Sequence, residues 1–350
     1  MSRQINFRAR TNVRAFTRRS ALKGGAMLGA GLAVSRFAII GRASAAPITM
    51  RFASDSPIVA PHTKSALVMK ELVENGTAGR VQVTVFPDGQ LGGGTANINS
   101  IKAGSLDAVV TAVSIISPAV PEIDVFSLPF LYTDAVEALR VANGPFGAKL
   151  APKVNAAFDC EVMGFTTDGV TELWTKPHPV TKPEEMVGLK VGVGTSKIQR
   201  DTMLAFGAIP TVLDITANYT SLQTGLINST AKTRPDVIQL KIYQVVKYLT
   251  LANLYSMPNL LIVSKKFLDK LTPQDREVVR AAGLPACEAQ KEVVLASAKE
   301  ALGFLKQHGI EPVEVENLQA FRDKVNGVYR DTGDRIGPEL VAEARKLASS

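Results

Sequence analysis

The chain has 350 residues, of which 46% are hydrophobic and 21% are charged, and its formal net charge is +8. This length is sufficient for two domains with sizeable cores. Residues 1–46 hold nine basic and no acidic residues, and subtracting them from +8 leaves −1 for the rest. The basic charge therefore describes the N-terminal segment, and we expect no nucleic-acid partner for the body of the protein.

Residues 1–46 are typical of a secretory signal. The segment Thr17–Lys23 (TRRSALK) is a twin-arginine pattern, an apolar run from Gly24 to Ile40 follows, and Ala43–Ala45 is a small-x-small cleavage site. The run is rich in glycine and contains Arg36, which makes it a poor membrane span. We therefore expect export by the twin-arginine route, cleavage near Ala45-Ala46, and a soluble mature protein in a bacterial periplasm.

The first part of the mature chain alternates between strand and helix patterns. Strands are expected at 48–53, 81–86 and 106–112, and helices at 62–75 and 97–103. This alternation, with a nearly continuous apolar run at 106–112, predicts an α/β layer built on a parallel sheet. Because prolines punctuate residues 118–129, we expect a linker there.

The second part continues with both kinds of pattern. The expected helices are 135–141, 146–158, 198–206, 217–226, a long stretch over 272–306, and 318–347. The expected strands are 160–167, 189–193, 249–254 and 259–264. Thr272 followed by Pro273 is a typical start for the long helix.

Motifs for metals, cofactors and catalysis are missing from the sequence. Cys160 and Cys287 are far apart in core-like surroundings, which predicts two buried free thiols. The three histidines, His62, His178 and His308, form no metal-binding pattern with them, so we expect no cofactor. The glycine turn 191–197 (VGVGTSK) has neither P-loop nor dinucleotide-binding spacing, and no G-x-S-x-G is present. These absences argue against an enzyme, although a periplasmic enzyme stays an alternative.

Phrases spread in order over almost the whole mature chain carry a family resemblance. They are VQVTVFPDGQLG (81–92), AGSLDAVV (103–110), VPEIDVFSLPFLY (120–132), KPEEMVGLKV (182–191), FGAIPT (206–211), YTSLQTGLIN (219–228), YQVVKYLTLAN (243–253) and LIVSKKFLDKL (261–271). With them the chain resembles the substrate-binding proteins of tripartite ATP-independent periplasmic (TRAP) transporters, the DctP-like family. The resemblance implies an α/β fold of two lobes, TRAP-type and type II-like, joined by crossover strands and a long helix.

The same resemblance implies which residues form each lobe and how the protein functions. Lobe I would comprise 47–168 with about 256–310, and lobe II 169–255 with about 311–350, including the C-terminal helices. A monomer would bind a small-molecule solute between the lobes and deliver it to a small and a large membrane subunit. A periplasmic sensor module of the same fold, presenting its ligand to a receptor, is an alternative.

Two positions where the family carries arginine are occupied by other residues here. By resemblance, Gly192 and Thr171 stand where arginines hold the ligand carboxylate. Three alternatives follow: a neutral or cationic ligand facing acids such as Asp55, Asp168, Glu172 and Asp214; an anion bound by Lys232, Arg200 or backbone N–H groups; or a diverged protein that binds weakly. The small residues favour the first alternative, because they would enlarge the cleft for a bulkier solute.

Further side chains near the expected cleft are also candidates. Trp174, the only tryptophan, could stack on a cyclic or cationic solute or pack in the core, and Tyr219 has the same two interpretations. The full set of candidate ligand-binding residues is Asp55, Thr171, Trp174, Gly192, Thr195, Asp214, Tyr219 and Lys232.

Overall fold

The computed structural model describes residues 46–213 and 215–348, which lie in one compact unit, Ala45–Ser350. The expected signal segment, apart from Ala46, and the candidate residue Asp214 are outside the described residues. No helix in the described part of the chain is both long and apolar enough to cross a membrane.

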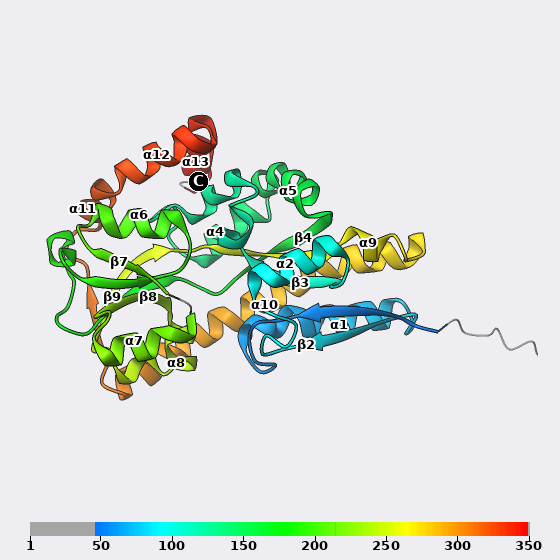
Figure 1. The fold of residues 1–350 in the computed structure, drawn as a ribbon, viewed down its shortest axis with the longest axis horizontal. Helices are drawn as coiled ribbons and strands as arrows, with labels where there is room; N and C mark the ends of the chain where they lie inside the picture. Colours follow the sequence, from blue (N-terminus) through cyan, green and yellow to red (C-terminus); the bar gives the residue numbers. More distant parts are fainter. Residues whose placement is uncertain (1–45, 214, 349–350) are drawn as a thin grey trace, which may run out of the picture. The chain divides into compact units, whose positions relative to one another are not determined.

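The first sheet has five strands in the order β2-β1-β3-β10-β4 (Figure 1). Strand β1 (Ile48–Ala53) pairs in parallel with β2 (Val81–Phe86) and β3 (Ala108–Ala112), as the alternating pattern predicts. Strand β10 (Pro258–Ser264) runs antiparallel to both β3 and β4 (Cys160–Thr167). The expected parallel layer is therefore only part of a mixed sheet, because a strand from far along the chain is inserted beside β3.

The second sheet has six strands in the order β11-β9-β5-β8-β6-β7. Their bounds are β11 Glu311–Glu314, β9 Tyr248–Tyr255, β5 Thr171–Thr175, β8 Ser229–Thr233, β6 Lys190–Val193 and β7 Ile209–Val212. Strand β5 is antiparallel to both of its neighbours, β8 and β9, whereas β6 is parallel to β7 and β8. The four strands that the pattern does not predict, β5, β7, β8 and β11, are four or five residues long, too short to establish a period.

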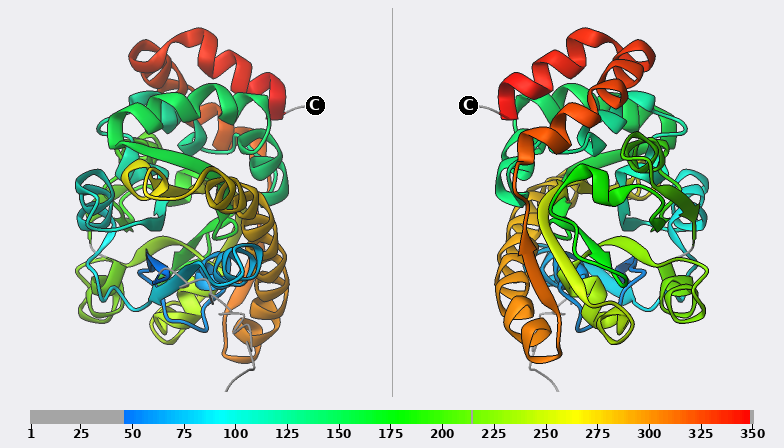
Figure 2. Two further views of the ribbon diagram at one scale, coloured as in Figure 1. Left: turned by 90° about the vertical axis from the view of Figure 1, so that its right-hand side faces the viewer. Right: turned by 90° about the vertical axis from the view of Figure 1, so that its left-hand side faces the viewer.

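The chain passes between the two sheets in two short connections. Residues 168–170 join β4 to β5, and residues 256–257 join β9 to β10. The helix α10 (Pro273–Gln307) also serves both sheets: its N-terminal half packs in one core with Met50 and Phe52 of β1, and its C-terminal half packs in another with Trp174 of β5 (Figure 2).

The remaining helices cover the faces of the sheets. They are η1 Pro61–Thr63, α1 Lys64–Gly76, α2 Gly94–Ala103, α3 Val113–Ile116, η2 Pro121–Ser127, α4 Ala135–Ala142, α5 Pro145–Phe158, η3 Pro183–Met186, α6 Lys197–Ala205, η4 Ile215–Ala217, α7 Asn218–Thr224, α8 Arg234–Gln239, η5 Ile242–Gln244, α9 Lys265–Leu268, α11 Leu318–Lys324, α12 Asn326–Ile336 and α13 Pro338–Ala348.

The expected linker at 118–129 is wrong, because most of it is the buried helix η2. Pro121 occupies the start of this helix, where the missing N–H has no structural consequence. Ile123, Val125 and Phe126 are at most 1% exposed, and the Phe126 ring contacts the ring of Phe146 edge-on. Prolines here begin a core element and do not mark a domain boundary.

The two cysteines are free and buried, as expected. Burial raises the pKa of the Cys160 and Cys287 thiols to about 12 in each case. Both thiols therefore remain protonated at neutral pH.

Candidate functional site

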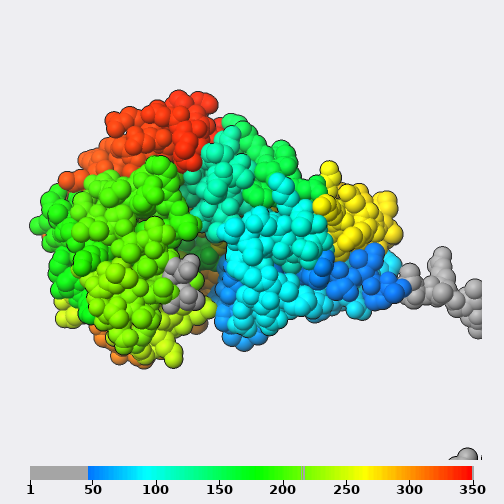
Figure 3. Space-filling model, in the orientation of Figure 1, coloured from blue at the N-terminus to red at the C-terminus, as the bar shows by residue number. Residues whose placement is uncertain are grey.

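A cavity of about 140 Å³ lies where the two sheets meet. The first sheet contributes Ala112 and Asn259, the helix α3 contributes Val113 and Ser114, and the connecting segments contribute Asp168, Gly169 and Met257. The second sheet and its helices contribute Thr171, Gln199, Ala231, Lys232, Thr233 and Asp236. Figure 3 shows a groove between the blue-to-cyan residues of the first sheet and the green residues of the second. The cavity is small compared with drug-sized sites of about 300–1,000 Å³, so it is suited to a small solute.

The cavity forms at strand ends, where side chains are no longer covered by a neighbouring strand. β3 ends at Ala112, β4 ends one residue before Asp168, and β8 ends at Thr233. Strand ends are where open α/β sheets generally bind ligands.

A larger cavity of about 190 Å³ lies elsewhere, beside β9 and α11, and includes Phe130, Leu251 and Leu318. Its only charged lining residue is Arg322. The smaller cavity brings Asp168, Lys232 and Asp236 together at the junction of the sheets, and for this reason we take it as the candidate site.

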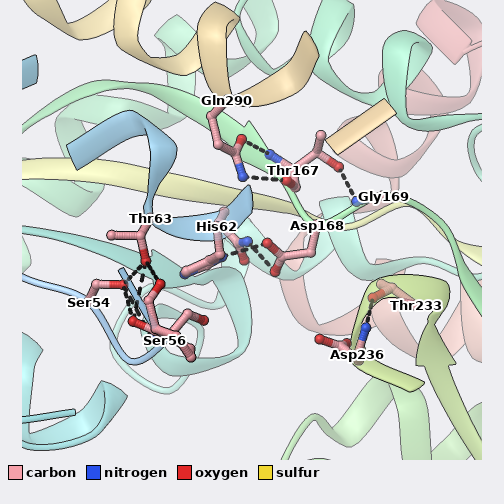
Figure 4. Close-up of polar contacts among 12 residues, drawn as sticks. Ser54, Ser56, His62, Thr63, Thr167, Asp168, Gly169, Thr233, Asp236 and Gln290 are labelled. Carbon is pink, nitrogen blue, oxygen red and sulfur yellow. Dashed lines mark hydrogen bonds and ion pairs between the residues drawn. The ribbon is translucent and has the colours of Figure 1, made fainter. Parts of the chain in front are cut away.

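Asp168, in the connection between the sheets, is the centre of a hydrogen-bond network (Figure 4). Its Oδ1 accepts a hydrogen bond from His62 Nδ1 at 2.6 Å, and its Oδ2 accepts one from Asn259 Nδ2 at 2.6 Å. Burial alone would lower the pKa of His62, but the carboxylates of Asp168, Asp236 and Asp55 raise it to about 9. Burial alone would raise the pKa of Asp168, but His62 and Asn259 lower it. His62 and Asp168 therefore form an ion pair at neutral pH.

Lys232 brings a second cation to the cavity. The residue is half-buried, and its ammonium group has no hydrogen bond or ion pair within the described residues. Burial lowers the pKa of Lys232, while the carboxylate of Asp236 acts in the opposite direction. An ammonium group that is partly desolvated and without a partner can gain a charge-assisted hydrogen bond from a ligand.

Asp236 lies in the first turn of α8, opposite the Asp168 network (Figure 4). Its backbone N–H donates to Thr233 Oγ1 at 3.3 Å, which caps the helix. Burial and the charge of Asp168 raise the pKa of Asp236, while Lys232, Thr233 and His62 lower it. No ion pair joins Asp236 to Lys232 in the described structure, although both line the cavity.

Glu172 does not face the cleft. It is 1% exposed, and its two carboxylate oxygens accept hydrogen bonds from Arg234 Nε at 2.8 Å and Nη2 at 2.6 Å. Glu172 is adjacent to Thr171 on β5, and alternate residues of a strand point to opposite faces, so only Thr171 lines the cavity.

Three further candidates have positions near the cavity. Thr171 and Lys232 line it, and their contact with a ligand stays a prediction. Asp55 is exposed and accepts a hydrogen bond from Asn97 Nδ2 at 3.0 Å. Its negative charge contributes to the raised pKa of His62. Asp55 is therefore a neighbour of the network and not part of the cavity lining.

Four candidates lie away from the cavity. Trp174 is fully buried in the core of the second sheet, where its Nε1 donates to the Lys232 carbonyl at 2.9 Å, so it offers no stacking face. Gly192 is buried too: an added Cβ would lie 2.8 Å from Ile227 Cδ1 and 3.0 Å from Asn218 Oδ1. The expectation that this glycine enlarges the cleft is therefore wrong. Thr195 is exposed, and Tyr219 on α7 donates a hydrogen bond from its Oη to Gln244 Oε1 at 3.3 Å.

Sequence reasoning missed His62, Asn259 and Asp236. His62 forms no metal-binding pattern and begins an expected helix, and Asn259 begins an expected strand, so neither position indicates a ligand. Asp236 follows a Thr-Arg-Pro helix start, which is a common capping pattern and gives no sign of a ligand. The signal available in the sequence was Asp168, an acid directly after the expected strand 160–167, because strand ends are where such sheets generally bind ligands.

Comparisons with known proteins test the family resemblance. A family model described as "Bacterial extracellular solute-binding protein, family 7" (DctP) matches residues 52–335. The C4-dicarboxylate-binding periplasmic protein DctP of Rhodobacter capsulatus is 28% identical over 310 residues, which are 87% of this chain and 92% of the relative.

Solved structures extend the likeness to three dimensions. A TRAP periplasmic solute-binding protein from Chromohalobacter salexigens, with bound D-glucuronate, has a TM-score of 0.81 and 25% identity, covering 85% of this chain and 99% of its own. One from Polaromonas, bound to D-erythronate, has a TM-score of 0.80 and 28% identity, covering 85% and 98%. These matches confirm the two-lobed α/β fold of the TRAP type.

Proposed function

Because the chain belongs to the bacterial extracellular solute-binding proteins of family 7, we propose that it is an extracytoplasmic receptor of a TRAP transporter. It captures a small organic solute in the cavity between the two sheets and delivers it to a small and a large membrane subunit. It performs no chemistry on the solute. The relatives are periplasmic proteins of such transporters, and this chain aligns with nearly their whole length.

We also propose how the protein is exported to the periplasm. Residues 1–46 direct export by the twin-arginine pathway and are removed near Ala45-Ala46, and the mature protein acts as a periplasmic monomer. The twin-arginine pattern and the small-x-small site support this. N-terminal sequencing of the periplasmic protein, with size-exclusion chromatography of the purified product, tests both points.

The two lobes move about the connections 168–170 and 256–257. Lobe I comprises 47–168 with about 256–310, and lobe II comprises 169–255 with about 311–350. The short connections between the sheets support this division, since hinges are a few residues that absorb large backbone changes. Closure would surround the solute and strengthen its polar contacts.

The solute carries a carboxylate that binds the ammonium group of Lys232. One observation carries this part: Lys232 is a half-buried cation that lines the cavity and makes no hydrogen bond or ion pair in the described structure. The relatives named above were solved with glucuronate and erythronate, which are carboxylates. Of the three alternatives left open by the sequence, an anionic group bound by Lys232 is therefore preferred over a ligand without one.

A thermal-shift screen tests the ligand class. Carboxylates should raise the melting temperature of the mature protein by mass action, and their uncharged amides should not. Lys232→Met should remove the shift. Arg200→Gln is the matched control, because Arg200 is an exposed cation of the same lobe that does not line the cavity. A carboxylate shift that survives in Lys232→Met, or amides that bind as well as the acids, would contradict the proposal.

A further inference from the structure

Three carboxylates and two cations interact at the junction of the sheets. The carboxylates are Asp55, Asp168 and Asp236, and the cations are His62 and Lys232. They come from the loop after β1, η1, the β4–β5 connection, β8 and α8. With all five ionised, the group carries one negative charge in excess.

Three of these five groups have already formed their contacts. His62 and Asp168 are paired at 2.6 Å, and Asn259 occupies the second oxygen of Asp168. Asp55 lies outside the cavity lining and is bound by Asn97. Lys232 and Asp236 remain as the two charged groups of the lining that are in no ion pair among the described residues, and they have opposite signs.

A ligand carboxylate on Lys232 would change the surroundings of Asp236. Lys232 is the cation in the lining that offsets Asp236, and a ligand carboxylate would share its charge. Asp236 would then face two carboxylates, those of Asp168 and of the ligand, in a partly desolvated cavity. Like charges in such a place are unfavourable unless a cation or a proton joins them.

An ammonium group on the same ligand removes this conflict. It would donate charge-assisted hydrogen bonds to Asp236 while the carboxylate accepts them from Lys232. A hydroxyl group at the same position could donate one hydrogen bond, but it would leave the charge uncompensated. The neighbouring Ala112, Val113 and Met257 offer apolar contact for a short side chain.

We propose that Asp236 is a specificity-determining residue, which makes the site select small solutes carrying both a carboxylate and an ammonium group, as an amino acid does. The inference rests on the proposed function, since it uses Lys232 as the carboxylate partner. It assigns to the cavity a zwitterionic solute, whereas the named relatives were solved with hydroxylated acids.

Matched pairs of ligands with one skeleton test this selectivity. L-alanine is compared with L-lactate, L-serine with L-glycerate, and L-aspartate with L-malate, by isothermal titration calorimetry on the mature protein. In at least one pair, the amino acid should bind at least tenfold more tightly than the hydroxy acid. Asp236→Asn should lower the amino-acid affinity at least tenfold and leave the hydroxy acid equal or tighter.

The control variant is Asp88→Asn. Asp88 is an exposed acid outside the cavity with a φ of 55°, a conformation that asparagine also adopts readily, and its replacement should leave both affinities unchanged. The melting temperature without ligand establishes that each variant is folded. If Asp236→Asn does not fold, the ratios measured on the unsubstituted protein still decide.

The two proposals fail differently. Hydroxy acids that bind as tightly as their amino partners, or a ratio unchanged in Asp236→Asn, would overturn the role of Asp236 and leave carboxylate capture standing. If no carboxylate of either kind binds, the proposed role of Lys232 fails, and this inference falls with it.

Discussion

Gln290 of the long helix α10 hydrogen-bonds both backbone groups of Thr167. Its Oε1 accepts from the Thr167 N–H at 3.1 Å, and its Nε2 donates to the Thr167 carbonyl at 2.6 Å. Thr167 is the last residue of β4, and its partner in the register of β10 is Pro258, which has no N–H to donate. The side chain of Gln290 thus supplies the hydrogen bonds that a neighbouring strand would otherwise make, at the point where the chain leaves the first sheet.

Replacing Gln290 with leucine should lower the free energy of unfolding by about 3 kcal/mol, because two buried backbone groups lose their partners at about 1–3 kcal/mol each. Urea unfolding followed by circular dichroism measures this. Glu292→Gln on the same helix is the control, since its side chain is 72% exposed and a change within about 0.5 kcal/mol is expected. A loss below about 1 kcal/mol for Gln290→Leu would mean that water replaces the side chain.

Arg234→Met should be among the most destabilising single substitutions. It leaves the buried carboxylate of Glu172 without its bidentate partner, and removal of one member of a buried pair typically costs about 3–5 kcal/mol. The double variant Glu172→Gln with Arg234→Met should recover most of this loss, because no uncompensated charge remains. A double variant as unstable as the single one would show that Arg234 acts through packing.

The ion pair of His62 and Asp168 should make stability depend on pH. The pKa of His62 is raised from 6.5 to about 9 in the folded protein, so its contribution is complete below about pH 6.5 and is lost as pH rises through about 9. On the acid side, the pKa of Asp168 is lowered, so its contribution is present above its ordinary value of 3.8 and is lost as pH falls through the lower folded value. The melting-temperature difference between the unsubstituted protein and His62→Gln should therefore shrink from pH 6.5 to pH 9.5. A difference that stays constant over this range contradicts the assignment.

Gly192→Ala should destabilise the protein by about 1–3 kcal/mol without creating carboxylate affinity, because the added methyl group meets Ile227 and Asn218 in a filled core. Gly303→Ala in α10 is the control, since nothing lies within 4 Å of its added Cβ and alanine favours a helix by up to about 1 kcal/mol. Carboxylate binding gained in a folded Gly192→Arg variant would mean that this position opens onto the ligand.

Strands could be predicted from the sequence where their hydrophobic pattern is clear, and not where it is absent. The runs VQVTVF and CEVMGFTT gave strands with the bounds observed for β2 and β4, because each is at least six residues long and clearly apolar or alternating. Strand β8 (STAKT) has no such pattern, and only pairing with β5 and β6 makes it a strand. Tertiary contacts decide such segments, and one sequence does not reveal them.

The site was predictable only where position along a strand settles the direction of a side chain. Thr171 and Lys232 line the cavity, whereas Trp174 and Gly192, on strands of the same sheet, face its core. Because successive side chains of a strand point to opposite faces of the sheet, an error of one position in the expected register assigns a residue to the wrong face. The position of Asp236 near Asp168 could not be predicted, because it depends on how α8 packs against the β4–β5 connection, which is distant in the sequence.

The two buried thiols make the protein well suited to spectroscopic labelling. Maleimide and methanethiosulfonate reagents react with the thiolate, and the pKa of about 12 at Cys160 and Cys287, together with their burial, keeps that species scarce at neutral pH. Cysteines introduced at exposed positions, one on each side of the cavity, would then be modified selectively while both native cysteines stay in place. A fluorophore pair attached in this way would test the proposed movement of the lobes directly, in a protein whose core is unaltered.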